Sequence, residues 1–163
     1  MKVTGFALAA LTAWTISLTG CHSHRVGSVA DLCSAKSSTF SDVLGRIASG
    51  SESDAISAVR SLSCLDGGNL EDAHIAIGEA AFKFPKKIAP LLQSASVGSN
   101  DLIAIATMLP PEYVDEPCES RDELTNRRMQ ISQDTAFSFA RAIVLQQLDS
   151  SIAKQNQWCK EVR

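Results

Sequence analysis

The sequence has few aromatic residues and lacks the signature motifs of the common enzyme classes. Aromatic residues make up 6% of the 163 residues, and Tyr113 is the one tyrosine. There is no H-E-x-x-H, no G-x-S-x-G, no phosphate-binding loop and no G-x-G-x-x-G motif. The serines have no recognisable His/Asp context. We therefore predict that the protein is not an enzyme and uses no cofactor.

Patterns typical of β-strands are also missing. No stretch alternates polar and apolar residues for long enough to predict a strand, whereas apolar residues recur at steps of three and four. Ala, Ser, Leu and Ile dominate the composition, which favours helices. We predict an all-α fold, an irregular bundle of about six or seven short helices. Residues 41–109 faintly resemble a helical-repeat array, but no fixed period supports that alternative.

The predicted helix boundaries depend on capping residues and on Gly and Pro. The spacing predicts a first helix over 29–47, kinked or split at 37–39 with a restart at Ser41, and ended by Gly50. Ser51 or Ser53 would cap the second helix.

Further along the chain, two asparagines and a proline mark predicted helix starts. Asn69 would cap the third helix, and Asn100 would cap the fifth. Between them, Pro85 opens a predicted helix over 85–94, since proline suits the first helical turn.

The N-terminal residues have the features of a targeting segment. Lys2 is the only charge before Arg25, and residues 3–20 are uncharged. The apolar core of this segment is short, Thr and Ser interrupt it, and no Lys/Arg cluster follows it at once. It therefore indicates a secretory signal peptide and not a permanent membrane span.

The segment ends in Leu18-Thr19-Gly20-Cys21. A cysteine preceded by glycine, with leucine three residues before it, resembles the lipobox of bacterial lipoproteins. The alternative is an ordinary secretory signal with an incidental cysteine. The resemblance implies cleavage before Cys21 and acylation of that residue, and two or more acyl chains give stable membrane anchoring. Because His22 follows and not Asp, it also implies export to the outer membrane, facing the periplasm, in a Gram-negative host.

These inferences divide the chain into a cleaved signal peptide (1–20), a lipidated N-terminus and tether (21–28) and a single helical domain (29–163). Cleavage after residue 20 of 163 leaves 143 residues, enough for one hydrophobic core. Removal of Lys2 changes the formal charge from −3 to −4. A mildly acidic chain is a poor candidate for binding nucleic acid, so we predict no such partner.

Four cysteines remain when Cys21 is set aside for lipid: Cys33, Cys64, Cys118 and Cys159. Outside the cytoplasm an even number of cysteines predicts disulfides. A zinc site is the competing interpretation, but no two of these cysteines have the close spacing that zinc ligands show.

Sequence alone allows three pairings of these cysteines, and helix geometry favours one of them. If the first two helices form a hairpin turning near 49–51, Cys33 and Cys64 lie at nearly the same height. We therefore prefer Cys33–Cys64, and Cys118–Cys159 follows by elimination. The second pair gives a less even geometry, because a turn near Ser132 requires residues 149–151 to break the last helix.

The three histidines do not form a recognisable site. His22 and His24 lie beside the expected lipid anchor, where loose metal binding is the alternative to no role. His74 lies on a predicted helix, where we expect it at the boundary of the core. We predict no catalytic residue and no metal site.

The segment 112–123 is acidic, with Glu112, Asp115, Glu116, Glu119, Asp122 and Glu123. One interpretation is that the later three favour a helix start and the others face water. The alternative is that Glu112, Tyr113, Asp115 and Glu116 form a docking surface for a basic partner, fixed by a disulfide. Calcium binding lacks the regular D-x-D-x-D spacing.

Together these features favour a membrane-anchored lipoprotein of the cell envelope that binds another protein without catalysis, including an inhibitor or immunity protein. Its expected partners are membrane lipid, through acylated Cys21, and an envelope protein. The alternatives are an accessory lipoprotein of an envelope or secretion assembly, and a carrier of a small apolar ligand between helices.

Overall fold

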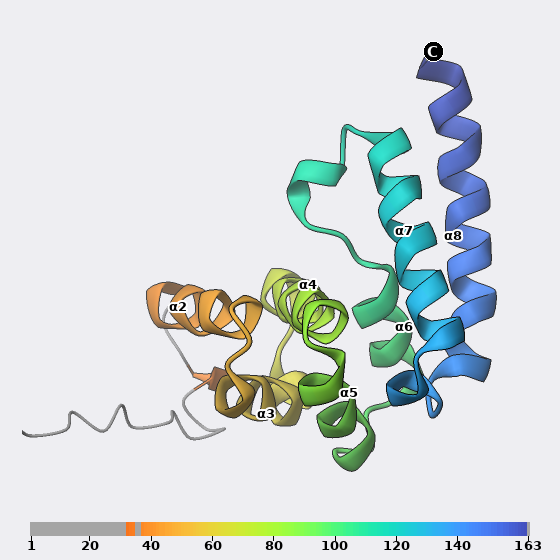
Figure 1. Ribbon diagram of the computed structural model, residues 1–163. Coiled ribbons are helices and arrows are strands. Elements are labelled where there is room, and N and C mark those ends of the chain that lie inside the picture. Colours follow the sequence, from red (N-terminus) through yellow and green to blue (C-terminus); the bar gives the residue numbers. More distant parts are fainter. Residues whose placement is uncertain (1–31, 35–36, 163) are drawn as a thin grey trace, which may run out of the picture.

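The computed structural model describes residues 32–34 and 37–162, and these contain helices and no strand (Figure 1). The predicted all-α class is confirmed. The expected signal peptide, Cys21, His22 and His24 lie outside the described residues. No helix in the described part of the chain is both long enough and apolar enough to cross a membrane.

The α-helices described are α2 (Ser37–Ala48), α3 (Glu52–Ser61), α4 (Gly67–Lys83), α5 (Pro85–Ser94), α6 (Ser99–Thr107), α7 (Pro117–Gln133) and α8 (Arg141–Val162), and the short 3-10 helices are η1 (Leu62–Cys64), η2 (Pro111–Tyr113) and η3 (Thr135–Phe137).

Helix α4 connects the two halves of the bundle. It packs against α2 on one side and α6 on the other, while α5 packs against α3 and α4. Helices α7 and α8 form a long antiparallel hairpin, and α6 packs against α8 (Figure 1). All seven helices contribute buried side chains to one apolar core. The end of the hairpin that carries the C-terminus projects away from α2 and α3 (Figure 1).

The junction between α2 and α3 follows the predicted capping chemistry. The side chain of Ser51 accepts a hydrogen bond from the backbone N–H of Asp54, so Ser51 is the N-cap of α3. Gly50 ends the first hairpin arm with a φ of 88°, and the Phe84 ring lies 2.7 Å from the place of a Cβ there. Helix α2 begins at Ser37, so the predicted restart at Ser41 is wrong.

Two predicted N-caps are wrong because the extended backbone ends before each asparagine. Asp66, with φ −138° and ψ 165°, precedes α4, so Asn69 is already the third residue of that helix. Gly98, with ψ 155°, precedes α6, so Asn100 is its second residue. The helix predicted over 85–94 is confirmed as α5.

Helix α8 is continuous, so the predicted break at 149–151 is wrong. The connection from α7 runs through η3 and includes residues 134–140, well beyond the predicted turn at Ser132. Cys118 therefore lies 15 residues before the end of α7 at Gln133, and Cys159 lies 18 residues after the start of α8 at Arg141. The longer connection makes the two arms nearly equal without a break.

Two disulfides staple this fold. Cys33 is joined to Cys64, with Cα atoms 5.7 Å apart, and Cys118 is joined to Cys159, with Cα atoms 4.9 Å apart. These are the pairs preferred from the sequence. The first fixes the segment before α2 to η1, and the second joins the start of α7 to the end of α8.

Candidate protein-docking site

The loop between α6 and α7 carries the predicted docking residues on an ordered backbone. The N–H of Tyr113 donates to the carbonyl oxygen of Pro110 at 3.0 Å. The hydroxyl of Ser120, on α7, donates to the carbonyl oxygen of Tyr113 at 2.6 Å. These bonds fix the backbone next to the acidic side chains, which reduces the entropy that binding a partner would cost.

A buried arginine fixes the start of this loop. The Arg127 side chain is 2% exposed, its Nη1 donates to the carbonyl oxygen of Met108 at 2.9 Å, and its Nε donates to Glu123 at 2.9 Å. Its guanidinium also lies over the Phe82 ring, 4.9 Å from the centroid. A cation at the end of α6 complements the helix dipole and satisfies its last carbonyls. Arg128, the next residue of α7, pairs with Asp149 on the surface, so Arg127 is the buried one of the two neighbouring arginines.

The loop and α8 form the two walls of a groove of about 350 Å³, which we call the loop–α8 groove. Its floor consists of side chains from the end of α6 and from α7. The loop wall contains Leu109, Pro110, Tyr113 and Val114, the α8 wall contains Ser151, Lys154, Gln155 and Trp158, and the floor contains Thr107, Ser120 and Leu124. The predicted residue Tyr113 therefore lines a concave surface.

Each wall exposes a large apolar side chain. Val114 is 74% exposed on the loop, and Trp158 is 43% exposed on α8. The Lys154 ammonium lies 4.7 Å from the centroid of the Trp158 ring, which is a cation–π geometry. Exposed apolar side chains on both walls of one groove are typical of a binding surface, whereas isolated ones are ordinary.

The loop wall of the groove carries three acidic residues that flank Tyr113 and Val114 in the sequence but do not line the groove, and we call them the rim. Glu112, Asp115 and Glu116 are exposed, and none of them forms an ion pair within the described part of the chain. The pKa of Tyr113 is raised, first by burial and then by the nearby carboxylates of Glu123 and Glu112. The four predicted residues are neighbours in the sequence and lie on one loop, and of the four Tyr113 lines the groove.

A second hollow, of about 270 Å³, shares Tyr113 and Pro110 with the groove. Its other lining residues are Glu79, Phe82, Lys83, Glu123, Arg127 and Gln130. Burial raises the pKa of Glu79, and the charge of Glu112 raises it further. The two carboxylates of this hollow, Glu79 and Glu123, are matched by two cations, Lys83 and Arg127, so the unpaired negative charge lies on the loop.

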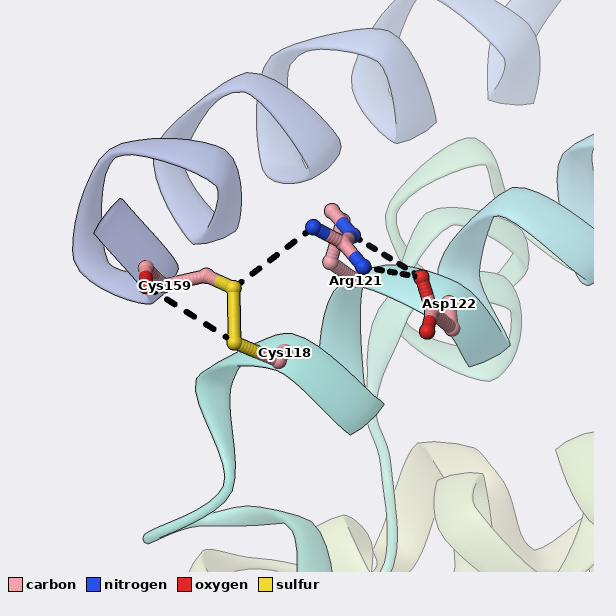
Figure 2. Close-up of a disulfide and its surroundings, with 4 residues drawn as sticks. All are labelled: Cys118, Arg121, Asp122 and Cys159. Atoms are coloured by element: carbon pink, nitrogen blue, oxygen red, sulfur yellow. Dashed lines mark hydrogen bonds and ion pairs between the residues drawn. A yellow bond between two sulfur atoms is a disulfide. The ribbon is translucent and has the colours of Figure 1, made fainter. Parts of the chain in front are cut away.

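The second disulfide lies at the open end of the α7–α8 hairpin. Cys118 is in the first turn of α7, and its sulfur lies 3.7 Å from the carbonyl oxygen of Cys159 (Figure 2). The guanidinium of Arg121 donates from Nη1 to the Cys159 sulfur at 3.5 Å and is held by Asp122 at 2.6 and 2.8 Å (Figure 2). The predicted docking loop ends directly at this disulfide.

The larger groove, of about 500 Å³, lies between α3 and the α5–α6 connection and contains none of the predicted site residues. Asp101 lines this groove and pairs with His74, whose Nε2 lies 2.9 Å from the Asp101 Oδ1. His74 is 4% exposed, so its predicted position at the core boundary is wrong. Its ring is buried because it reaches from α4 to the first turn of α6.

The described residues contain no group of three or more His, Cys, Asp and Glu side chains arranged to hold a metal ion. The loop–α8 groove instead provides apolar contacts, backbone rigidity and unpaired carboxylates, which suit protein binding. Sequence reasoning missed Val114, Lys154 and Trp158. The available signal was Trp158, which directly follows the polar run 154–157.

Comparisons with protein-family models, with curated proteins and with solved structures found no match.

Proposed function

We propose that the protein is a membrane-anchored lipoprotein of the cell envelope that binds another protein and catalyses no reaction. One observation carries this proposal. Val114 and Trp158 are exposed on opposite walls of a groove, and the loop that carries Val114 also carries three exposed carboxylates that form no ion pair among the described residues. A large aromatic anchor beside a polar rim is the usual anatomy of a protein interface.

The membrane anchor in this proposal is Cys21. The sequence Leu18-Thr19-Gly20-Cys21 supports it, because acylation requires a cysteine directly after the cleavage point. The Cys33–Cys64 disulfide ties the first described residues to η1, at the side of α3 (Figure 1). A domain tethered from that side would present the α7–α8 end, with its groove, away from the membrane.

The charge of the rim favours a partner with a basic surface. Glu112, Asp115 and Glu116 have no cationic partner among the described residues, and Lys154 is the only cation lining the groove. Charge complementarity of this kind accelerates association and excludes partners of the wrong sign. One version of the proposal is an inhibitor or immunity protein that holds a basic secreted hydrolase.

The test is affinity purification of the full-length lipoprotein from its own host. We expect a co-purifying protein that is lost from the triple variant Glu112→Lys, Asp115→Lys, Glu116→Lys. A matched control reverses three exposed acidic side chains that do not line the groove, Glu52 on α3 and Glu71 and Asp72 on α4, and should retain the partner.

Three outcomes would change the proposal. Full retention by the triple variant would remove the acidic rim from the interface. Absence of any stoichiometric partner of the wild type would contradict the protein-binding function. Recovery of components of a secretion or outer-membrane assembly would favour the accessory role over the inhibitor role.

Intact-mass analysis of the same material tests the anchor, because Cys21 should be the first residue and carry acyl chains.

A further inference from the structure

Apart from the main chain, the Cys118–Cys159 disulfide is the only covalent connection between the two walls of the loop–α8 groove within the described residues. Val114 lies four residues before Cys118, and Trp158 directly precedes Cys159. The disulfide therefore sets the separation between the two exposed apolar side chains.

Apolar packing contributes little at this end of the hairpin. Beyond Leu148, Cys159 is the only residue of α8 that is buried, and Ile152 is partly buried. In α7, the first buried apolar side chain is Leu124, two turns into the helix. Segments with few buried contacts open locally at low free energy, so the covalent bond has a large share in holding this end closed.

The surroundings of the two sulfurs suit thiol–disulfide exchange. Cys118 is half-buried in the first turn of α7, whereas Cys159 is 2% exposed, so an attacking thiolate reaches the Cys118 sulfur first. Arg121 donates to the Cys159 sulfur, and Asp122 holds the guanidinium in place (Figure 2). An adjacent cation stabilises the thiolate that leaves, and a better leaving group speeds exchange.

We propose that the Cys118–Cys159 disulfide is a redox switch that opens the loop–α8 groove. The inference concerns regulation of the proposed docking site, and its biological meaning rests on that proposed function. A thiolate of a dithiol reductant attacks the Cys118 sulfur and forms a mixed disulfide, while the bonding electron pair leaves on the Cys159 sulfur beside Arg121. The second thiolate of the reductant then attacks the reductant sulfur that is bonded to Cys118. This step closes the disulfide of the reductant and releases Cys118 as a thiolate.

The reaction is balanced by the reductant. Two protein thiols form, the reductant becomes a disulfide, and the two protons of the dithiol end on Cys118 and Cys159. The loop carrying Val114 and the last turns of α8 carrying Trp158 are then no longer tied together. The groove loses the fixed spacing of its walls, and a partner bound across both walls is released.

The first measurement follows the exchange chemistry with dithiothreitol on the full-length protein. Differential alkylation and mass spectrometry report the two disulfides separately, so Cys33–Cys64 is an internal control. We expect Arg121→Gln to slow reduction of Cys118–Cys159 at least about threefold, and Arg121→Lys to restore it, because the cation stabilises the leaving thiolate. Arg128→Gln, a loss of charge elsewhere on α7, should have no effect. Equal rates in Arg121→Gln and wild type would overturn the role of Arg121.

The second measurement is hydrogen exchange of the full chain with the disulfide absent. In Cys118→Ser/Cys159→Ser, protection in 149–162 and 109–117 should fall at least about tenfold while α2 to α5 keep theirs. Cys33→Ser/Cys64→Ser is the matched control and should leave both segments protected. Unchanged protection in the double variant would overturn the switch. Loss of protection throughout the domain would also overturn it, because the disulfide would then hold the whole fold and not one site.

Failure of this inference can be told apart from failure of the proposed function. Exchange rates and hydrogen exchange need no partner, so they decide the switch even where none is found. A recovered partner that binds the oxidised protein and Cys118→Ser/Cys159→Ser equally well would overturn the switch and leave the docking function in place.

Discussion

Arg127 donates from Nη1 to the carbonyl oxygen of Met108 at 2.9 Å, which joins α7 to the point where α6 ends and the acidic loop begins. The same guanidinium pairs with Glu123 and lies over Phe82 on α4. Three helices therefore meet at one cation that is almost completely buried. The position of the docking loop depends on this contact as much as on the disulfide that follows it.

Replacement of this cation should destabilise the domain. Arg127→Met leaves the Met108 carbonyl oxygen and the Glu123 carboxylate without their partner, and we expect a loss of about 3 kcal/mol in the free energy of unfolding. Urea denaturation monitored by circular dichroism measures it. Arg128→Met removes the neighbouring surface ion pair with Asp149. It should leave the urea midpoint unchanged within experimental error. Equal effects of the two variants would show that burial of Arg127 is not what stabilises the loop.

The approach of α4 to α6 requires a glycine at position 78. A Cβ built on Gly78 overlaps the carbonyl oxygen of Ile105, which is backbone and cannot rotate away. Gly78→Ala should therefore destabilise the protein by about 1–3 kcal/mol, the usual cost of overpacking. Gly45→Ala on α2 is the control, because no atom lies within 4 Å of its added Cβ. Gly45→Ala should stabilise the helix by about 0.5–1 kcal/mol. The thermal midpoint should therefore fall in Gly78→Ala and rise in Gly45→Ala, and a shift of both midpoints in the same direction would contradict the argument.

The helices could be predicted because their ends are marked locally. Gly50, Ser51 and Pro85 act on the backbone next to them, and each marks the predicted boundary. The predictions at Asn69 and Asn100 were wrong because the extended residue that precedes a helix can lie two or three positions before a good capping side chain. The length of the α7–α8 connection was missed because 3-10 turns have no apolar period to detect.

The acidic loop could be predicted from composition, but the groove could not. The opposing wall comes from α8, 37 to 44 residues along the chain from Val114, and only tertiary packing brings it beside the loop. Arg127 was missed for a related reason. Its burial depends on carbonyl groups at the end of α6. The spacing of apolar residues along α7 contains no information about these carbonyl groups, and it treats every charged residue as exposed.

Acid should weaken the contact between α2 and α3. A hydrogen bond from Arg46 lowers the pKa of Asp54, burial opposes the shift, and the hydroxyl of Ser51 adds to it. Because the pKa is lower in the folded state, the carboxylate stabilises the fold above its unfolded pKa of about 4, and the stabilisation is lost as pH falls through the folded pKa.

The measurement is urea denaturation from pH 6 to pH 2 for the wild type and Asp54→Asn. The wild type should be the more stable near pH 6, and the difference should shrink as the pH approaches 2. Asp72→Asn, at an exposed position of α4, is the control and should follow the wild type throughout. A difference between wild type and Asp54→Asn that stays constant over this range would contradict the prediction.

Trp158 should contribute more to partner binding than any acidic residue of the rim. Its ring is large, lies at the wall of the groove and is held by Lys154, so little entropy is lost when a partner covers it. We expect Trp158→Ala to weaken binding of the co-purified partner at least about thirtyfold, equivalent to about 2 kcal/mol, chiefly through faster dissociation.

Ile143 provides the matched control for this experiment. It is 40% exposed on α8, close to the 43% of Trp158, but lies in the first turn of the helix and does not line the groove. Ile143→Ala should therefore leave the dissociation rate unchanged. Biolayer interferometry with the purified partner measures this rate. The charge reversals at the rim should instead reduce the association rate, and this effect should weaken as salt is added, because charges at a rim act at long range. If Trp158→Ala and Ile143→Ala bind alike, the partner contacts the acidic loop without entering the groove, because the exposed ring would otherwise be part of the interface.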